Sequence, residues 1–122
     1  MKAAVLVRKG SADKAFEIRN VEQPTPKTGE VLIKVECFGL NYADVMARFG
    51  QYKAAPKMPS IVGYEVVGVV QEVAQGGNQE LLGKRVVAFT RFGGYAEFAV
   101  TPEDACAEIG DMHAAQACAI AV

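Results

Sequence analysis

The sequence has only one histidine, His113, only three cysteines and no tryptophan among its 122 residues. One histidine cannot make a metal site, and no Ser/His/Asp or Cys/His constellation can be assembled without it, so hydrolytic and thiol mechanisms have no support. Cys37, Cys106 and Cys118 are odd in number and lack the Cys-x-x-Cys spacing of a zinc knuckle. We therefore interpret them as small buried hydrophobic residues in a reducing compartment, and we expect a cytoplasmic protein.

Long apolar runs and clustered charges are also missing. No apolar stretch reaches the roughly 18 residues of a membrane span, and the apolar start is too short for a signal peptide. The 13 basic and 14 acidic side chains nearly balance, and no run of Lys and Arg forms a stripe. Because phosphate groups are bound by clustered positive charge, nucleic acid is a poor candidate partner. At this length we expect one domain whose core needs neither disulfides nor metals.

Alternating apolar and polar residues dominate the first hundred positions and predict a mainly β fold. In Glu30–Phe38 the apolar side chains alternate with Lys34 and Glu36, which is typical of an antiparallel strand with one solvent-facing side. Glycines interrupt the β-branched run Ile61–Val73, so we expect a strongly bent strand there. The other predicted strands are Ala3–Val7, Phe16–Val21, Arg85–Phe89 and Tyr95–Val100.

Two segments have helical character. Residues 41–49 begin with Asn41 and carry Asp44 three positions later, which is a capping-box-like start. The second segment begins near Asp111, is rich in alanine and runs to Val122 without a terminating glycine or proline. We therefore predict a domain over residues 1–110, followed over 111–122 by the start of a further helix.

Five motifs, in order, resemble the amino-terminal half of the medium-chain dehydrogenase/reductases. They are MKAAVLVRKG, PTPKTGEVLIKVECFGLNYADVMARFGQY, MPSIVGYEVVGVV, LLGKRVVAF and GGYAEFAV. The third contains the family pattern P-x-x-x-G-x-E-x-x-G, matched by Pro59, Gly63, Glu65 and Gly68. The resemblance implies a GroES-like, partly open β-barrel on the substrate side of a cleft, with one short helix near 41–49. It also implies that the helix starting at 111–122 leads into a dinucleotide-binding Rossmann domain, which these residues do not include.

The zinc ligands of the alcohol-dehydrogenase branch are replaced in this sequence. Asn41 stands in the slot of a zinc-binding Cys, and Tyr64 stands in the slot of a zinc-binding His. Zinc sites are built from thiolate, imidazole and carboxylate, so neither residue substitutes for the one it replaces. The resemblance therefore implies the zinc-free quinone oxidoreductase and VAT-1-like branch, with no metal site.

The glycine-rich turn that binds a dinucleotide in this superfamily is missing from the sequence. Gly76-Gly77 and Gly93-Gly94 lack the G-x-G-x-x-G spacing and do not open helices, so we expect them to be hairpin turns. The resemblance thus implies a domain that is inactive by itself. In the intact protein, expected to be a homodimer, the cofactor would be NADPH and the substrate a small quinone or enone.

In such a reaction the cofactor carries the hydride chemistry, while the protein contributes orientation and electrostatics. We predict Asn41, Asp44 and Tyr52 as catalytic residues: Asn41 as an amide donor in the slot of the lost metal ligand, Asp44 one helical turn further on, and Tyr52 as a phenol at the substrate mouth. Asn41 and Tyr64 are predicted to contact the cofactor.

Each candidate also has a purely structural interpretation. Asn41 can serve as a helix cap, Asp44 can bond back to the helix start, and Tyr52 and Tyr64 can pack on the barrel. Glu65 is interpreted as a structural carboxylate bonded to nearby backbone or to an arginine. The alternative function is a non-enzymatic, VAT-1-like binding protein, and a third is a free-standing barrel that resembles the chaperonin partner.

Overall fold

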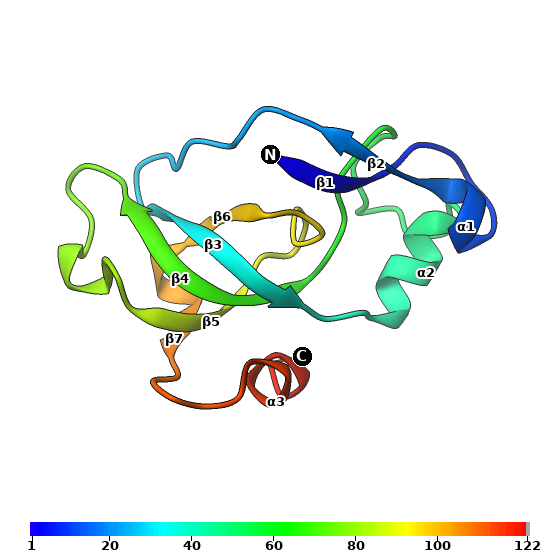
Figure 1. The fold of residues 1–122 in the computed structure, drawn as a ribbon. Coiled ribbons are helices and arrows are strands. Elements are labelled where there is room, and N and C mark those ends of the chain that lie inside the picture. Colours follow the sequence, from blue (N-terminus) through cyan, green and yellow to red (C-terminus); the bar gives the residue numbers. More distant parts are fainter. Residues whose placement is uncertain (122) are drawn as a thin grey trace.

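Two open antiparallel sheets carry most of the chain in the computed structural model, which describes residues 1–121 (Figure 1). The smaller sheet pairs β1 (Lys2–Leu6) with β2 (Phe16–Asn20). The larger sheet has the strand order β6-β3-β4-β5-β7. Its strands are β3 (Glu30–Phe38), β4 (Glu65–Val73), β5 (Arg85–Phe89), β6 (Phe98–Pro102) and β7 (Cys106–Glu108). The mainly β fold class is confirmed, and over residues 1–121 the sheets do not close into a complete barrel.

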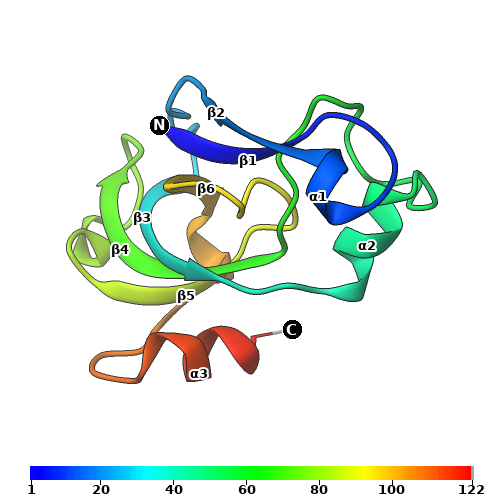
Figure 2. The same ribbon diagram turned by 45° about the vertical axis from the view of Figure 1, so that its right-hand side comes forward.

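Residues 1–121 also contain three short α-helices and two 3-10 turns. They are α1 (Ala12–Ala15), α2 (Tyr42–Arg48), α3 (Ala114–Ala119) and the turns Gln79–Leu81 and Glu103–Ala105. In both views α1 and α2 lie together at the end of the small sheet, while α3 runs below the large sheet (Figures 1 and 2). The helix predicted over 41–49 is confirmed. The predicted second helix begins at Ala114 instead of Asp111, and Val122 lies outside the described residues.

The central strands β3 and β4 curve strongly around one face of the large sheet (Figure 2). Their pairing register shifts twice, between Leu32 and Ile33 and between Val35 and Cys37. A Cβ atom at Gly68 of β4 would overlap the carbonyl group of Lys34 on β3, so only glycine permits this close approach of the two strands. Gly68 is therefore the feature of the sequence that explains the bend predicted for β4.

The first part of strand β4 is buried on both faces, because α3 packs against one of them. Val66 and Val70 belong to the main core between the strands. Val67 points the other way and packs against Ala117 and Cys118 of α3. Small side chains on α3 let the helix approach the sheet closely, and this contact brings Cys118 to the neighbourhood of β4's first residue.

The solvent-facing side predicted for β3 is only partly exposed. Lys34 and Glu36 are exposed, as the alternation indicated, but Leu32 on the same side is buried. The main-core side holds Val31 and Ile33. The antiparallel character predicted for this strand is confirmed by both of its partners, β4 and β6.

Strand β4 begins at Glu65, four residues later than the predicted start at Ile61. The preceding carbonyl groups are bonded to a loop instead of a strand: Ile61 accepts from the Gly93 N–H at 2.9 Å, and Val62 accepts from the Tyr95 N–H at 3.0 Å. Apolar alternation alone does not distinguish a sheet ladder from such strand-to-loop pairing.

Strand β6 begins at Phe98, three residues later than the predicted start at Tyr95. The Ala4 N–H of β1 donates to the Tyr95 carbonyl at 2.9 Å, and the Glu97 N–H donates to the Lys2 carbonyl at 3.1 Å. Residues 95–97 therefore connect the small sheet to the large one. Since β5 and β6 are not neighbours in the sheet, the turn at Gly93-Gly94 is not a hairpin, and that prediction is wrong; Gly76-Gly77 does lie between paired strands, β4 and β5.

Candidate functional site

Helix α2 begins where the chain leaves the end of β3, and its first turn holds two of the predicted catalytic residues. Asn41 is the N-cap, with an extended backbone at φ −127° and ψ 157°. Its main-chain N–H donates to the Asp44 carboxylate at 3.0 Å, within a capping box. The capping-box prediction is confirmed, and it places Asn41 and Asp44 side by side.

The Asn41 side chain is held by Glu65 at the start of β4. Its Nδ2 atom lies 3.0 Å from Oε1 and 2.7 Å from Oε2 of the Glu65 carboxylate. The two N–H bonds of an amide diverge far more widely than the two oxygens of one carboxylate, so a single N–H makes both contacts. The second N–H of Asn41 remains available. Sequence reasoning expected a backbone or arginine partner for Glu65, and the structure provides Asn41 instead.

Glu65 is one of few buried ionisable side chains, at 3% exposed. Burial raises the pKa of its carboxyl group, the hydrogen bond from Asn41 lowers it, and the negative charge of Asp44 raises it, with a net upward direction. The carboxylate fits only because Gly39 has no side chain, since a Cβ there would overlap Oε1 of Glu65. Gly39 also donates its N–H to the Glu65 carbonyl at 3.2 Å.

Asp44 has a second partner that sequence reasoning missed. The Tyr95 hydroxyl donates to Oδ2 of Asp44 at 2.8 Å, and both side chains are buried. The Tyr95 ring stacks on Phe38, with centroids 4.6 Å apart and planes at 26°. Burial, followed by the hydrogen bond to Asp44 and its charge, raises the pKa of the Tyr95 phenol. The one signal in the sequence was a tyrosine within a predicted strand, because a buried phenol needs a partner.

Tyr52 and Tyr64 form a separate pair. Their hydroxyl groups are hydrogen-bonded, with Tyr64 as donor and Tyr52 as acceptor. Burial, then the hydrogen bond to Tyr52, raises the pKa of Tyr64 to about 12; the negative charge of Asp44 adds to the rise and the positive charge of Arg91 opposes it. The Tyr64 phenol therefore stays protonated at neutral pH, and the contact between the two hydroxyl groups uses the Tyr64 hydrogen.

Two phenylalanines extend this tyrosine pair into an aromatic cluster. Phe92 makes edge-on or tilted contacts with Tyr52 and Tyr64, with centroids 6.2 and 6.1 Å apart. Phe89 lies 5.7 Å from the Tyr64 ring and is 45% exposed. No pattern in the sequence indicated this grouping, because the four side chains come from a loop, the approach to β4, the end of β5 and the loop that follows it.

Asn41 lines two clefts, each of about 330 Å³. One is shared with Asp44 and Tyr95 on the side of α2. The other is shared with Glu65 and lies between the end of β3 and α3; its remaining lining residues are Cys37, Phe38, Gly39, Leu40, Ala115, Cys118 and Ala119. The structure thus brings Asn41 and Asp44 together with Glu65 and Tyr95, while Tyr52 and Tyr64 line neither cleft.

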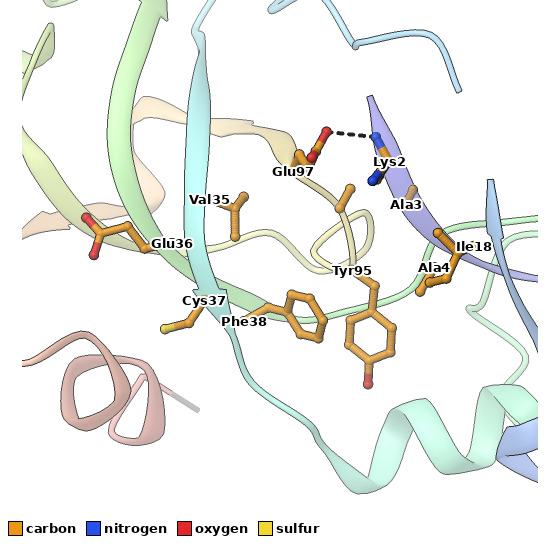
Figure 3. A pocket seen from close by; sticks show the side chains of 11 residues that line it. Lys2, Ala3, Ala4, Ile18, Val35, Glu36, Cys37, Phe38, Tyr95 and Glu97 are labelled. Atoms are coloured by element: carbon orange, nitrogen blue, oxygen red, sulfur yellow. Dashed lines mark hydrogen bonds between the residues drawn. The ribbon is translucent and has the colours of Figure 1, made fainter. Parts of the chain in front are cut away.

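A third, larger groove of about 530 Å³ adjoins the α2 cleft through Ala4, Phe38 and Tyr95 (Figure 3). Its walls come from β1 and β2 on one side and from β3 and residues 95–97 on the other. Most lining side chains are apolar; the Glu97 carboxylate accepts the main-chain N–H of Lys2 at 2.8 Å at one end. Figure 3 shows the Phe38 and Tyr95 rings side by side, at the end toward α2.

Metal-ligating side chains do not gather in the part of the chain that the structure describes. Over residues 1–121, no three His, Cys, Asp or Glu side chains come together as a potential metal site. Cys118 is buried, and burial followed by the proximity of Cys37 and Glu65 raises the pKa of its thiol to about 12. Of the helices in these residues, none has the length and apolar character that a membrane crossing requires.

Comparison with known proteins relates this fold to oxidoreductases and to VAT-1 proteins. Residues 27–111 match the family described as the alcohol dehydrogenase GroES-like domain. An alcohol dehydrogenase of Geobacillus stearothermophilus is 34% identical over 139 aligned positions, covering 91% of this chain and 40% of the relative.

Two solved structures show the same architecture. The human synaptic vesicle membrane protein VAT-1 homolog-like protein superposes with a TM-score of 0.92 at 32% identity, covering 98% of this chain and 39% of the other. The quinone oxidoreductase from Thermus thermophilus, solved also in complex with NADPH, gives 0.80 at 35% identity, covering 98% and 36%. The chain therefore spans no more than about two fifths of the length of these relatives.

Proposed function

Because this chain belongs to the alcohol dehydrogenase GroES-like domain family, within the medium-chain dehydrogenase/reductases, we propose that it forms the substrate side of a zinc-independent quinone or enone reductase that uses NADPH. Support comes from the likeness to quinone oxidoreductases, one of them solved with NADPH. The observation that carries the proposal is the Asn41 amide, fixed on Glu65 at the junction of two clefts with one N–H unused.

The residues around Asn41 fit the nicotinamide end of the cofactor only. NADPH, when bound, supplies the hydride. The amide oxygen of Asn41 can accept from the carboxamide N–H of a nicotinamide ring, which leaves the remaining N–H of Asn41 for the acceptor molecule. The turns at Gly76 and Gly93 open no α-helix, so neither supplies the helix N-terminus on which a glycine-rich turn holds a pyrophosphate. We therefore propose that these 122 residues orient the reacting groups and leave most of the cofactor affinity to further protein.

Two donors serve the acceptor molecule in this proposal. The free N–H of Asn41 donates to the carbonyl oxygen on which negative charge develops, which lowers the barrier most when the donor is already in place. The Tyr52 hydroxyl, whose oxygen accepts from Tyr64, lies outside both clefts and donates to a part of the acceptor molecule that extends beyond them. In this proposal Asp44 contacts neither the nicotinamide ring nor the acceptor molecule. It holds the start of α2, and with it the main chain of Asn41.

The test uses the full-length protein that contains this domain. We expect NADPH oxidation with a benzoquinone, and we expect Asn41→Ala to lower kcat about 100-fold, the cost of removing one oxyanion donor. Asn78→Ala is the matched control, because Asn78 is exposed and serves only a 3-10 turn. Reductase activity from residues 1–122 alone would contradict the proposal that most of the cofactor affinity lies in further protein. Stoichiometric zinc in the purified protein would contradict zinc independence.

The likeness to the VAT-1 homolog-like protein favours a second candidate function, a binding protein without catalysis. The same full-length sample separates the two candidates. NADPH binding with quinone turnover supports the reductase, whereas neither binding nor turnover in a folded protein supports the binding function.

A further inference from the structure

The contact between Asn41 and Glu65 fixes more than the position of a side chain. An asparagine amide can turn over about its terminal bond and present either its oxygen or its nitrogen to a ligand at little cost. An ionised carboxylate only accepts hydrogen bonds. Both Glu65 oxygens lie on Nδ2, and in the capping box the Asn41 side chain accepts from the main-chain N–H of Asp44. The amide is therefore held with its nitrogen toward β4 and its second N–H turned away from Glu65.

Glu65 is itself anchored from several sides, so it is a firm support. In the ladder between β4 and β5, Glu65 is paired with Phe89. Its main-chain carbonyl accepts from the Gly39 N–H at 3.2 Å and from the Cys118 thiol at 3.9 Å. The side chain lies over Gly39, in the space that the missing Cβ leaves open for it. Asn41, at the start of a short helix, is thereby tied to the central strand of the sheet.

We propose that Glu65 is a positioning residue for Asn41, which it locks as a hydrogen-bond donor toward the cleft. The inference rests on the proposed function and deepens it. The ligand group recognised at Asn41 is then a hydrogen-bond acceptor, such as the carbonyl oxygen of a quinone or enone. Glu65 acts through orientation, because its own negative charge opposes charge on that oxygen.

The variants separate orientation from charge. Glu65→Gln keeps an acceptor oxygen at the same reach and removes the charge, so we expect kcat within a few fold of wild type. Glu65→Leu removes the acceptor, and we expect kcat to fall about tenfold or more with the KM for NADPH nearly unchanged. Gly39→Ala displaces the carboxylate without altering either partner and should resemble Glu65→Leu. Glu72→Leu is the control, since Glu72 is exposed on the same strand.

Nuclear magnetic resonance of the 122-residue chain tests the contact without any activity. The side-chain amide signals of Asn41 should shift in Glu65→Leu and stay in place in Glu72→Leu. If Glu65→Leu does not fold, the wild-type protein provides the test, because the signals of the Asn41 amide should titrate with the Glu65 carboxyl. That carboxyl lies near Asp44 and Cys118 and shares a cleft with Cys37. Asn41 amide signals that neither shift in Glu65→Leu nor titrate with the Glu65 carboxyl would overturn the proposal.

The activity assays and the nuclear magnetic resonance measurements together distinguish a failure of the proposed function from a failure of the positioning role. A full-length wild type without reductase activity contradicts the proposed function, and the amide signals still decide the contact. An active wild type whose Glu65→Leu variant keeps its kcat, or whose Glu65→Gln variant loses as much as Glu65→Leu, contradicts the positioning role.

Discussion

At the scale of single residues, Asp44 connects the helix start to the core. Its Oδ2 atom accepts from the Asn41 N–H at 3.0 Å and from the Tyr95 hydroxyl at 2.8 Å. Asp44 is only 6% exposed. Because a buried carboxylate is costly unless donors surround it, the Tyr95 hydroxyl contributes to stability as well as to the placement of Asn41.

Removing that hydroxyl tests its contribution. Tyr95→Phe keeps the ring that stacks on Phe38 and leaves Asp44 with one donor fewer. We expect the free energy of unfolding to fall by about 1–3 kcal/mol, measured by chemical denaturation. Tyr42→Phe is the control, because Tyr42 is 76% exposed and should lose almost nothing. Equal losses in the two variants would show that the hydrogen bond to Asp44 carries no weight.

Residue-level predictions from the sequence succeeded where the partner was near in the chain. The capping box joins Asn41 to Asp44 three positions on, and the spacing alone indicated it. The partners of Glu65 and Tyr95 are 24 and 51 positions away. No local pattern specifies such pairs, because they depend on how β4 and the loop before β6 fold back onto α2.

At the scale of elements, the close approach of β3 and β4 depends on Gly68. Gly68→Ala should lower the free energy of unfolding by about 1–3 kcal/mol or more, because the added methyl group overlaps the Lys34 carbonyl, which belongs to the backbone and cannot swing aside. Gln71→Ala, at an exposed position of the same strand, is the control. Denaturation curves of the two variants measure the difference, and a Gly68→Ala protein as stable as wild type would refute this explanation of the bend.

Strand prediction was reliable where a strand pairs along its whole length. Glu30–Phe38 and Arg85–Phe89 were predicted with the bounds that the structure has. The starts of β4 and β6 were predicted too early, since residues 61–64 and 95–97 bond to a loop and to β1 instead of continuing the ladders of the large sheet. The short elements α1 and β7 went unpredicted because four and three residues carry no measurable period.

At the scale of the whole molecule, buried thiol and phenol groups determine how the free energy of unfolding changes at alkaline pH. Burial raises the pKa of Cys118 to about 12 from an ordinary value of 9.0, and it also raises the pKa of Tyr95. Above about pH 9 the unfolded chain loses these protons while the folded chain keeps them, so stability falls as the pH rises toward 12. Denaturation at neutral pH and at about pH 10 should show the loss, and Cys118→Ala should reduce it. Stability that is flat or rising over this interval would contradict the burial of these groups.

The family, the mainly β fold and the clustering of Asn41 with Asp44 could be predicted from the sequence, because the motifs that carry them are contiguous. The extent of the fold is a different matter: the chain spans at most about two fifths of the relatives described above. The homodimer, the cytoplasmic location and the domain boundary at 110 stay predictions.

The packing of Glu65 over Gly39 also has an evolutionary consequence. A side chain at position 39 would collide with the carboxylate, so in a lineage that keeps Glu65, mutations there meet an immediate penalty. The same mutation becomes tolerable once a shorter residue stands at 65, and Asn41 then loses the contact that constrained it. The order of substitutions is therefore restricted: change at 65 opens the path to change at 39 and 41, and descendants should inherit the three positions as a linked set.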